Sequence, residues 1–331
     1  NKPNIIIILT DDQPDDTLKY LPSVQNKLGD NGVTFTNAYV TTALCCPSRS
    51  SILSGQYAHN HSVVTNFPPA GGIRKFSDKE TLPVWLEKGG YKTGLFGKYL
   101  NDYDQLNPYI PPGWTTWVAF DDKNGLYFDY KLNINGKSKS FGDKEKDYST
   151  DVLAEEAVQF IKKSKEPFFV YYAPHAPHGV PKPAPRDLKN CKKLGVPRNP
   201  AFNEDNVSDK PSWMKKLPKL NKVQIKDVDE EYDNKICTLH AVDRAVDDII
   251  KALGTKRNNT AIFFLSDNGF AFGNHRWDTK ACAYEVCVGV DMVISYPPLT
   301  KGKKVTDQFG LNIDLAPTIL DLAGLPIPSS V

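Results

Sequence analysis

Five short, almost continuously apolar runs limit the folds open to this chain more than any other feature. Such runs suit strands that are covered on both faces, as in a largely parallel sheet, whereas a half-solvated strand alternates apolar and polar residues. The predicted strands are residues 5–9, 92–96, 168–172, 261–265 and 292–295.

Two segments between these runs carry the apolar spacing of amphipathic helices. One starts near Ser149-Thr150-Asp151, whose side chains are favoured N-caps, and repeats apolar residues as far as Ile161. The other covers about residues 233–253 and places its apolar residues on one face. Strands that alternate with such helices predict an α/β protein in which helices flank the sheet.

Two long segments show neither the apolar runs of buried strands nor the apolar spacing of helices. Residues 102–146 are rich in Asn, Gly, Pro and Tyr and are predicted to include a small hairpin, and residues 181–227 are rich in Lys and Pro. A long irregular segment in a compact domain is usually either functional or disordered. We expect a solvated loop at 181–227, although a Lys-rich loop beside a pocket also suits an anionic substrate.

Polar side chains follow four of the predicted strands at the point where each strand ends. Ligands of open α/β sheets bind at the carboxyl ends of the strands, so these side chains are expected to meet at one edge. They are Asp11-Asp12, Gly97-Lys98, His175 with His178, and Asp267-Asn268.

Length and charge exclude several classes of protein. With 331 residues the chain is long enough for one large domain, or for a large domain and part of a second. The net charge of +2 is too small to indicate nucleic acid or a membrane surface as a partner. No apolar run is long enough to cross a bilayer, so no membrane span is predicted. The chain begins with polar residues and shows no signal peptide, as a processed or trimmed protein would.

The cysteines and the glycosylation sequons bear on the compartment. The six cysteines lack the paired C-x-x-C spacing of structural zinc sites. Cys282 and Cys287 are close enough in sequence to form a disulfide, although sequence alone does not establish bridges. Sequons at Asn60, Asn206 and Asn258 are compatible with the secretory pathway, so a secreted or lysosomal protein is expected.

The two acidic strand ends together predict a metal site. Asp11 and Asp12 repel each other unless a cation or a proton lies between them. Asp267 and Asn268 add a carboxylate and an amide oxygen, and hard oxygen ligands suit calcium or magnesium better than zinc. Either pair alone is more simply a turn or a helix cap.

The decisive segment is Cys-Cys-Pro-Ser-Arg at residues 45–49. It resembles the signature of the formylglycine-dependent sulfatases, in which a maturation enzyme oxidises the first cysteine of the signature to an aldehyde. Only Cys45 has a proline two positions later and an arginine four positions later, so Cys45 is the predicted site of modification, with Cys46 at the variable position. An isolated Cys-Pro-Ser would instead indicate a buried cysteine near a helix start.

The resemblance covers nearly the whole chain. It implies an alkaline-phosphatase-like (sulfatase) fold with a large, mixed, mostly parallel sheet flanked by helices, and it makes residues 1–331 the catalytic domain. Residues 314–321 resemble the helix that closes the family's large domain, and the smaller C-terminal subdomain is expected to be absent or truncated. The resemblance also implies one calcium ion, whose ligands are Asp11, Asp12, Asp267, Asn268 and the modified Cys45.

The family mechanism assigns a task to the remaining residues. Hydrated formylglycine is a geminal diol, and calcium with Arg49 favours the anionic form of one hydroxyl, which attacks sulfur. Lys98 and Lys280 offset charge on the sulfate oxygens, and His178 protonates the departing alcohol. The second hydroxyl then expels sulfate and restores the aldehyde. Three further histidines are expected either to contact the substrate or to support the scaffold: His59, His175 and His275.

Two departures from the family pattern refine these expectations. Many members have Gly-Lys-Trp-His, whereas residues 97–101 are Gly-Lys-Tyr-Leu-Asn, a string that resembles N-acetylglucosamine-6-sulfatases and extracellular heparan endosulfatases. The predicted substrate is therefore 6-sulfated N-acetylglucosamine in a sulfated glycan, with small aryl sulfates as the alternative. The second departure is Gly289-Val290-Asp291, where the family usually has Val-Pro after a basic residue, so the local backbone is not predicted there.

Two other interpretations stay open. A phosphatase or phosphodiesterase of the same fold would usually use Ser or Thr as nucleophile with zinc, which the signature at Cys45 disfavours. A catalytically inactive homologue that binds sulfated glycans would keep Cys45 as a thiol.

Overall fold

A ten-stranded mixed sheet forms the centre of the molecule in the computed structural model, which describes residues 2–121 and 126–331. Five neighbouring pairs are parallel, β10·β2, β8·β1, β1·β7, β7·β3 and β3·β4, and antiparallel pairs lie between and beyond them. The strand order is β10-β2-β9-β8-β1-β7-β3-β4-β5-β6. The strands are β1 (Asn4–Thr10), β2 (Val33–Tyr39), β3 (Lys92–Gly97), β4 (Thr116–Phe120), β5 (Lys131–Ile134), β6 (Lys137–Ser140), β7 (Phe168–Ala173), β8 (Thr260–Ser266), β9 (Met292–Ser295) and β10 (Lys304–Leu311).

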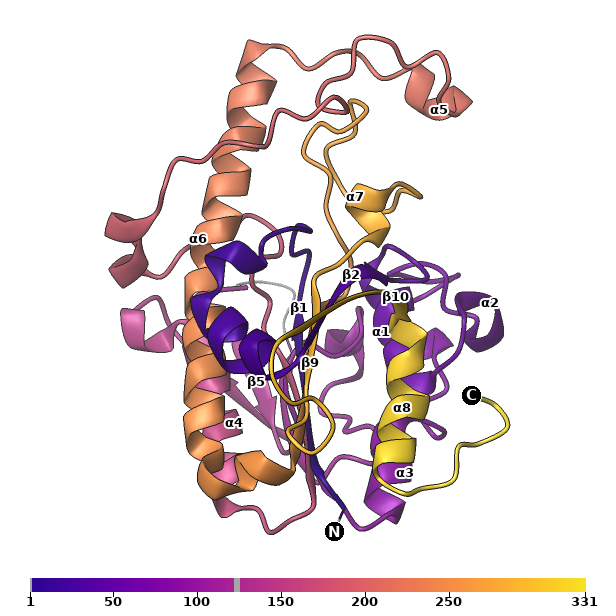
Figure 1. The fold of residues 1–331 in the computed structure, drawn as a ribbon, viewed down its shortest axis with the longest axis vertical. Coiled ribbons are helices and arrows are strands. Elements are labelled where there is room, and N and C mark those ends of the chain that lie inside the picture. Colours follow the sequence, from indigo (N-terminus) through magenta and orange to yellow (C-terminus); the bar gives the residue numbers. More distant parts are fainter. Residues whose placement is uncertain (1, 122–125) are drawn as a thin grey trace.

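Helices cover both faces of this sheet, so the predicted fold class is confirmed. In Figure 1, α4 and α6 lie on one side of the strands, and α1, α3 and α8 lie on the other. The helices are α1 (Cys45–Ser54), α2 (Ala58–His61), α3 (Leu82–Lys88), α4 (Ser149–Lys163), α5 (Ser212–Lys215), α6 (Lys222–Leu253), α7 (Glu285–Val288) and α8 (Leu315–Leu322).

The burial of the central strands explains why their sequences are continuously apolar. Every residue of β1, β7 and β8 is buried. Successive β1 side chains alternate between two apolar clusters, because neighbouring residues of a strand point to opposite faces. Ile5 and Ile7 join the cluster that includes α1, α3 and α8, whereas Ile6 and Ile8 join the cluster that includes α4 and α6.

The five apolar runs all form strands, and the structure adds strands that the runs did not reveal. The hairpin expected within residues 102–146 is β5 and β6, whereas β4, in the same segment, joins the sheet through β3. β2 is half-buried, and β10 is an edge strand with mostly exposed side chains, so neither needs a continuous apolar run. Residues 122–125 of the segment lie outside the described residues.

Two predicted helix starts are wrong. α6 begins at Lys222 rather than near residue 233, because Asn221 and Gln224 form a capping box ahead of turns that face solvent and so carry no apolar stripe. For the same reason the end of the 181–227 segment is helical. The N-cap of α4 is Tyr148, not Ser149-Thr150-Asp151, and Ser149 Oγ instead donates to the Leu126 carbonyl oxygen at 2.6 Å.

Two disulfides tie loops to their surroundings. Cys282 pairs with Cys287, as their spacing allows, and Cys191 pairs with Cys237 of α6, which anchors the irregular segment before that helix. Cys45 and Cys46 are buried free cysteines. Within the described part of the chain, none of the helices has both the length and the apolar character needed to cross a membrane.

Candidate active site

The polar strand ends do meet at one edge of the sheet. β8, β1, β7 and β3 are consecutive in the strand order and mutually parallel, so their carboxyl ends lie side by side. Gly97 at the end of β3 has φ 124°, and a Cβ there would lie 2.0 Å from the Ala173 carbonyl oxygen. Because glycine permits this close approach, Lys98 N donates to the same carbonyl at 2.7 Å and its side chain turns to the end of β1.

Helix α1 brings the predicted nucleophile position to these strand ends. Cys45 is the first residue of α1, and all ten residues of the helix are buried. Arg49 lies one turn later on the same face, because residues four apart in a helix are neighbours. The helix therefore presents Cys45 and Arg49 together to the carboxyl ends of the strands.

Two carboxylates and a histidine surround the sulfur. Cys45 Sγ is 3.5 Å from Asp11 Oδ1 and 3.9 Å from Asp12 Oδ1. His178 Nε2 is 3.6 Å from Asp12 Oδ2. One candidate ligand atom from each of these four residues lies within 4.8 Å of the other three.

The remaining two predicted metal ligands are tied to this cluster. Asp267 accepts from Asp12 N at 3.1 Å and from Arg49 Nε at 2.9 Å. Asn268 Nδ2 donates to Asp12 Oδ1 at 2.7 Å, while Asn268 Oδ1 is buried with no hydrogen-bond partner among the described residues. A buried carbonyl oxygen without a donor needs a further partner, and a group of carboxylate and amide oxygens has the ligand chemistry of a calcium site. The residues present therefore fit a hard divalent cation.

Three cationic side chains balance three carboxylates. Lys98 Nζ is 2.5 Å from Asp11 Oδ2, and Lys280 Nζ is 2.6 Å from Asp12 Oδ1 and 2.7 Å from Cys45 Sγ. Arg49 is fully buried and also donates to the Lys98 carbonyl oxygen at 3.0 Å. Buried charges persist only when they are paired in this way.

Burial and these neighbours shift the acid pKa values in different directions. Burial raises the pKa of all three carboxyls, but at Asp11 the electrostatic interactions with His178, Lys98 and Arg49 prevail, and its pKa lies well below the ordinary value. Lys280 and His178 likewise lower the pKa of Asp12. At Asp267 burial and the charge of Asp11 prevail and raise the pKa to about 6.

The Cys45 thiol is not activated as a thiolate. Burial raises its pKa far above the ordinary value, although Lys98 and Lys280 oppose that shift. A neutral thiol is a weak nucleophile. An unmodified Cys45 is therefore a weak nucleophile in these surroundings.

Both histidines after β7 are neutral at neutral pH. Burial lowers the pKa of His175 to about 4 and that of His178 to about 3, although Asp11 opposes the shift at each. His175 Nδ1 is 3.5 Å from Asp11 Oδ2, and its ring packs on Phe120 with centroids 4.1 Å apart. His175 thus lies beside the cluster.

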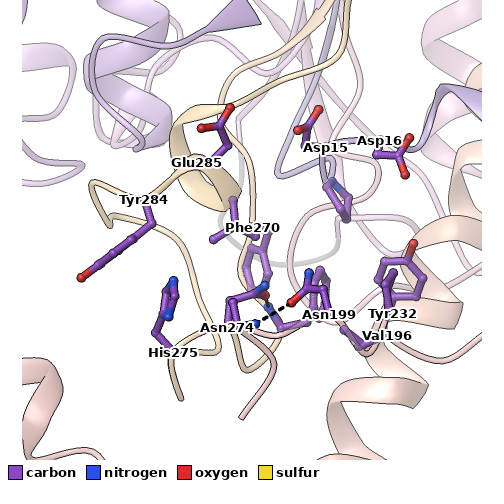
Figure 2. Close-up of a pocket in the computed structure, with 15 residues that line it drawn as sticks. Asp15, Asp16, Val196, Asn199, Tyr232, Phe270, Asn274, His275, Tyr284 and Glu285 are labelled. Atoms are coloured by element: carbon purple, nitrogen blue, oxygen red, sulfur yellow. Dashed lines mark hydrogen bonds between the residues drawn. The ribbon is translucent and has the colours of Figure 1, made fainter. Parts of the chain in front are cut away.

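The structure places His275 and His59 elsewhere. His275 Nδ1 is 2.6 Å from Glu204 Oε2, and the ring packs on Tyr284. His275 lines a cavity of ≈ 390 Å³ together with the carboxylates of Asp15, Asp16 and Glu285 (Figure 2). His59 is exposed.

A second cavity, of ≈ 250 Å³, adjoins the cluster directly. It is lined by Lys98, His175 and His178. Its other walls come chiefly from the segment after β3 and from the rings of Phe67 and Phe120. The lining residues of that segment include Tyr99, Leu100, Asn101, Asp102 and Tyr103.

Two buried charged residues near the cluster were not predicted as site residues. Lys235 on α6 is 0% exposed, and Asp291 before β9 is 8% exposed. Lys235 stands among the apolar positions of an amphipathic helix, and that break in the pattern was the available signal. Asp291 is the second departure from the family pattern.

Asp291 has a structural explanation. Its Oδ2 accepts hydrogen bonds from Gln13 Nε2 at 3.2 Å, Thr17 N at 3.0 Å, Thr17 Oγ1 at 3.1 Å and Leu18 N at 3.1 Å. The residue therefore fastens the segment that follows Asp11 and Asp12 to the start of β9.

The fold and the cluster of polar side chains at the strand ends indicate the class of protein. A protein solved in complex with its substrate D-glucosamine-2-N,6-O-disulfate has the same fold, with a TM-score of 0.80 and 24% identity over 99% of this chain and 78% of that chain. The predicted alkaline-phosphatase-like architecture is confirmed. The sulfatase family profile matches residues 3–325, so the chain belongs to the sulfatase family, and the resemblance seen at residues 45–49 is confirmed.

Curated relatives extend this assignment. N-acetylglucosamine-6-sulfatase of Homo sapiens is 37% identical over 98% of this chain and 61% of that protein. Extracellular sulfatase SULF-1 homolog of Drosophila melanogaster is 35% identical over 99% of this chain and 30% of that protein. The chain thus spans less than two thirds of the length of either relative.

Proposed function

We propose that this protein hydrolyses sulfate monoesters of carbohydrates and that 6-sulfated N-acetylglucosamine is its substrate. One observation carries the proposal. Cys45, at the start of α1, lies within 4 Å of Asp11, Asp12 and Lys280, in a buried cluster that joins oxygen ligands with cations. Membership in the sulfatase family supports the reaction class, and the relative named N-acetylglucosamine-6-sulfatase supports the sugar.

The proposed reaction uses two groups beyond the encoded side chains. Asp11, Asp12, Asp267, Asn268 and residue 45 would hold one calcium ion, and residue 45 would be oxidised to formylglycine by a maturation enzyme. Together these groups supply an activated oxygen nucleophile, which the buried, neutral thiol does not.

The cations of the cluster bind and stabilise the sulfate. Lys98 pairs with Asp11 and Lys280 pairs with Asp12, and both carboxylates lie beside residue 45. Both ammonium groups therefore lie where a sulfate group bound at residue 45 would gain negative charge. Preformed positive charge in a site that excludes water stabilises such a transition state most effectively. Arg49 holds Asp267 and lies beneath the cluster, so it orients the carboxylates as well as adding charge.

His178 protonates the departing alcohol. His178 is the histidine in the cluster around residue 45, and its Nε2 is 3.6 Å from Asp12 Oδ2. Its pKa of about 3 describes the protein without substrate, and an anionic sulfate next to the ring favours the protonated form. His175 packs beside it and is proposed to contact the substrate.

The sugar is proposed to occupy the ≈ 250 Å³ cavity beside Lys98 and His178. Aromatic rings of Tyr99 and Phe120 offer apolar faces, and Asn101 offers an amide, the combination that pockets for small polar ligands use. The cavity opens on the segment at residues 97–101 that distinguishes this chain from many family members.

A secretory-pathway location, either lysosomal or extracellular, is part of the proposal. Asn60, Asn206 and Asn258 are all exposed and so accessible to glycosylation. A relative named as an extracellular sulfatase homolog supports the same location.

The test compares three esters with protein that was coexpressed with a formylglycine-generating enzyme. The proposal expects sulfate release from 6-sulfated N-acetylglucosamine and from 4-nitrophenyl sulfate, far less phosphate release from 4-nitrophenyl phosphate, and no sulfate release by a Cys45→Ala variant. Turnover of the aryl sulfate alone would establish a generic arylsulfatase. Binding of sulfated glycans without any turnover would establish the inactive homologue and overturn the proposal.

A further inference from the structure

Lys235 is a buried cation that the proposed mechanism does not use. It lies near the middle of α6, its side chain is 1% exposed, and it is among the largest fully buried side chains of the described residues. A buried ammonium group costs free energy that an apolar side chain of similar length would avoid. Packing alone therefore does not explain a lysine at this position.

The contacts of the ammonium group point to the loop that carries the two active-site histidines. Lys235 Nζ donates to the Pro177 carbonyl oxygen at 3.1 Å and lies 4.2 Å from the centroid of the Phe270 ring. Its carboxylate neighbour is Glu231, with Oε1 3.7 Å away and a side chain that is 35% exposed. The shortest of these contacts is thus to the residue directly before His178.

Three successive carbonyl oxygens of this loop each accept a hydrogen bond. Ala176 O accepts from Asp11 N at 3.2 Å, Pro177 O accepts from Lys235 Nζ, and His178 O accepts from Tyr127 Oη at 2.9 Å. Lys235 is the charged donor among the three, and charge-assisted hydrogen bonds are the stronger ones. The backbone on both sides of the His178 side chain is therefore fixed from outside the loop.

The His178 ring itself has weak restraints. Its Nε2 is 3.6 Å from Asp12 Oδ2, beyond hydrogen-bond distance, and its Nδ1 has no partner among the residues that the structure describes. The direction of the ring consequently depends on packing and on the backbone that carries it.

We propose that Lys235 is a positioning residue, which holds the Pro177 carbonyl and thereby directs the His178 ring at the leaving group. This inference rests on the proposed function, in which His178 protonates the departing alcohol. A lysine also suits this position because its length spans from α6 to the loop and its charge strengthens the hydrogen bond to a carbonyl oxygen.

The role has a signature that depends on the leaving group. 4-Nitrophenolate is stable without a proton and departs without a general acid, whereas a sugar alkoxide needs protonation as the bond to sulfur breaks. Lys235→Met should lower kcat for 6-sulfated N-acetylglucosamine by about 10- to 100-fold, the range expected when a catalytic group is misplaced by roughly 1 Å. It should leave kcat for 4-nitrophenyl sulfate and both KM values close to those of the wild type. Lys235→Arg, which keeps a charged donor, should restore most of the loss.

A matched control and a second variant separate positioning from folding. Lys226→Met removes an exposed lysine from the same helix and should behave as the wild type on both esters. Tyr127→Phe removes the donor to His178 O and should reproduce the same selective loss. The thermal midpoint of Lys235→Met should stay close to that of the wild type, because removal of a buried charge offsets the loss of the donor to the Pro177 carbonyl oxygen.

The outcomes distinguish the two proposals. A wild-type protein that hydrolyses neither ester contradicts the proposed function. An active wild type in which Lys235→Met loses activity equally on both esters, or on neither, overturns the role of Lys235 and leaves the proposed function standing. If Lys235→Met does not fold, the same comparison is made with Lys235→Arg and Tyr127→Phe, and an unselective loss in Tyr127→Phe overturns the inference.

Discussion

Asp291 gives a quantitative test, because two substitutions there should act in opposite directions at different pH. Burial and the charge of Asp15 raise the pKa of Asp291 to about 7 in the folded protein, against an ordinary value near 3.8. The folded state therefore binds more protons than the unfolded state between these values, and stability falls as pH rises through this window. With these two pKa values, the wild type loses about 2.5 kcal/mol from this group between about pH 5 and about pH 8.

The two variants isolate the charge and the hydrogen bonds. Asp291→Asn removes the charge but keeps an oxygen that accepts from Thr17 N and Leu18 N. Its stability relative to the wild type should therefore rise by about 2.5 kcal/mol between about pH 5 and about pH 8, and it should be clearly more stable than the wild type near pH 8. Asp291→Ala leaves both backbone donors without an acceptor, and at about 1–3 kcal/mol for each unpaired donor it should be less stable than the wild type by about 3 kcal/mol near pH 5.

Urea unfolding at the two pH values measures these differences. Comparing each variant with the wild type at the same pH cancels the contribution of every other titrating group. An Asp291→Asn variant that is no more stable than the wild type near pH 8 would refute the reasoning about the buried carboxyl. Equal stability of Asp291→Ala and Asp291→Asn near pH 5 would refute the reasoning about the hydrogen bonds.

Three further predictions follow from buried groups. Arg49→Ala should lower stability by about 3–5 kcal/mol in urea unfolding, because it leaves Asp267 buried without its cation, and an unchanged midpoint would contradict the pairing. His61 Nδ1 accepts a hydrogen bond from Val63 N, and burial lowers the pKa of His61 to about 4. The free energy of unfolding should therefore fall as pH falls from about 6.5 to about 4. This dependence on pH should be weaker in His61→Gln, and an equal dependence would contradict the buried, neutral state of His61. Calcium at 100 times its Kd should raise the free energy of unfolding by about 2.7 kcal/mol, and EDTA should reverse this gain. The same gain in Asp12→Asn would contradict the role of Asp12 as a calcium ligand.

The strands could be predicted because burial on both faces of the sheet requires a continuously apolar sequence. β1, β7 and β8 are buried on both faces, so their sequences are apolar throughout, and polar residues appear where each strand leaves the core. The gathering of Asp11, Lys98 and His178 then follows from the parallel pairing of β1, β7 and β3, with Gly97 allowing the Lys98 side chain to turn to the end of β1.

Elements that solvent partly covers left no comparable signal. The first turns of α6 are held by a capping box, and β10 is an edge strand with an exposed surface, so neither required apolar periodicity. His275 could not be placed, because its position depends on a loop that packs against Glu204 from a distant, irregular segment. Lys235 was hidden for the opposite reason, since a single buried charge on an apolar face looks like an exception until its acceptor at Pro177 is known.

The identity of the side chain at residue 45 tests the central claim most directly. Protein coexpressed with a formylglycine-generating enzyme is digested, and the mass of the peptide that contains Cys45 is measured beside sulfate release from the same preparation. The account predicts that residue 45 has lost one sulfur and two hydrogens and gained one oxygen, and that activity rises in proportion to the converted fraction. Sulfate release at full rate by protein in which the Cys45 thiol is intact would contradict it.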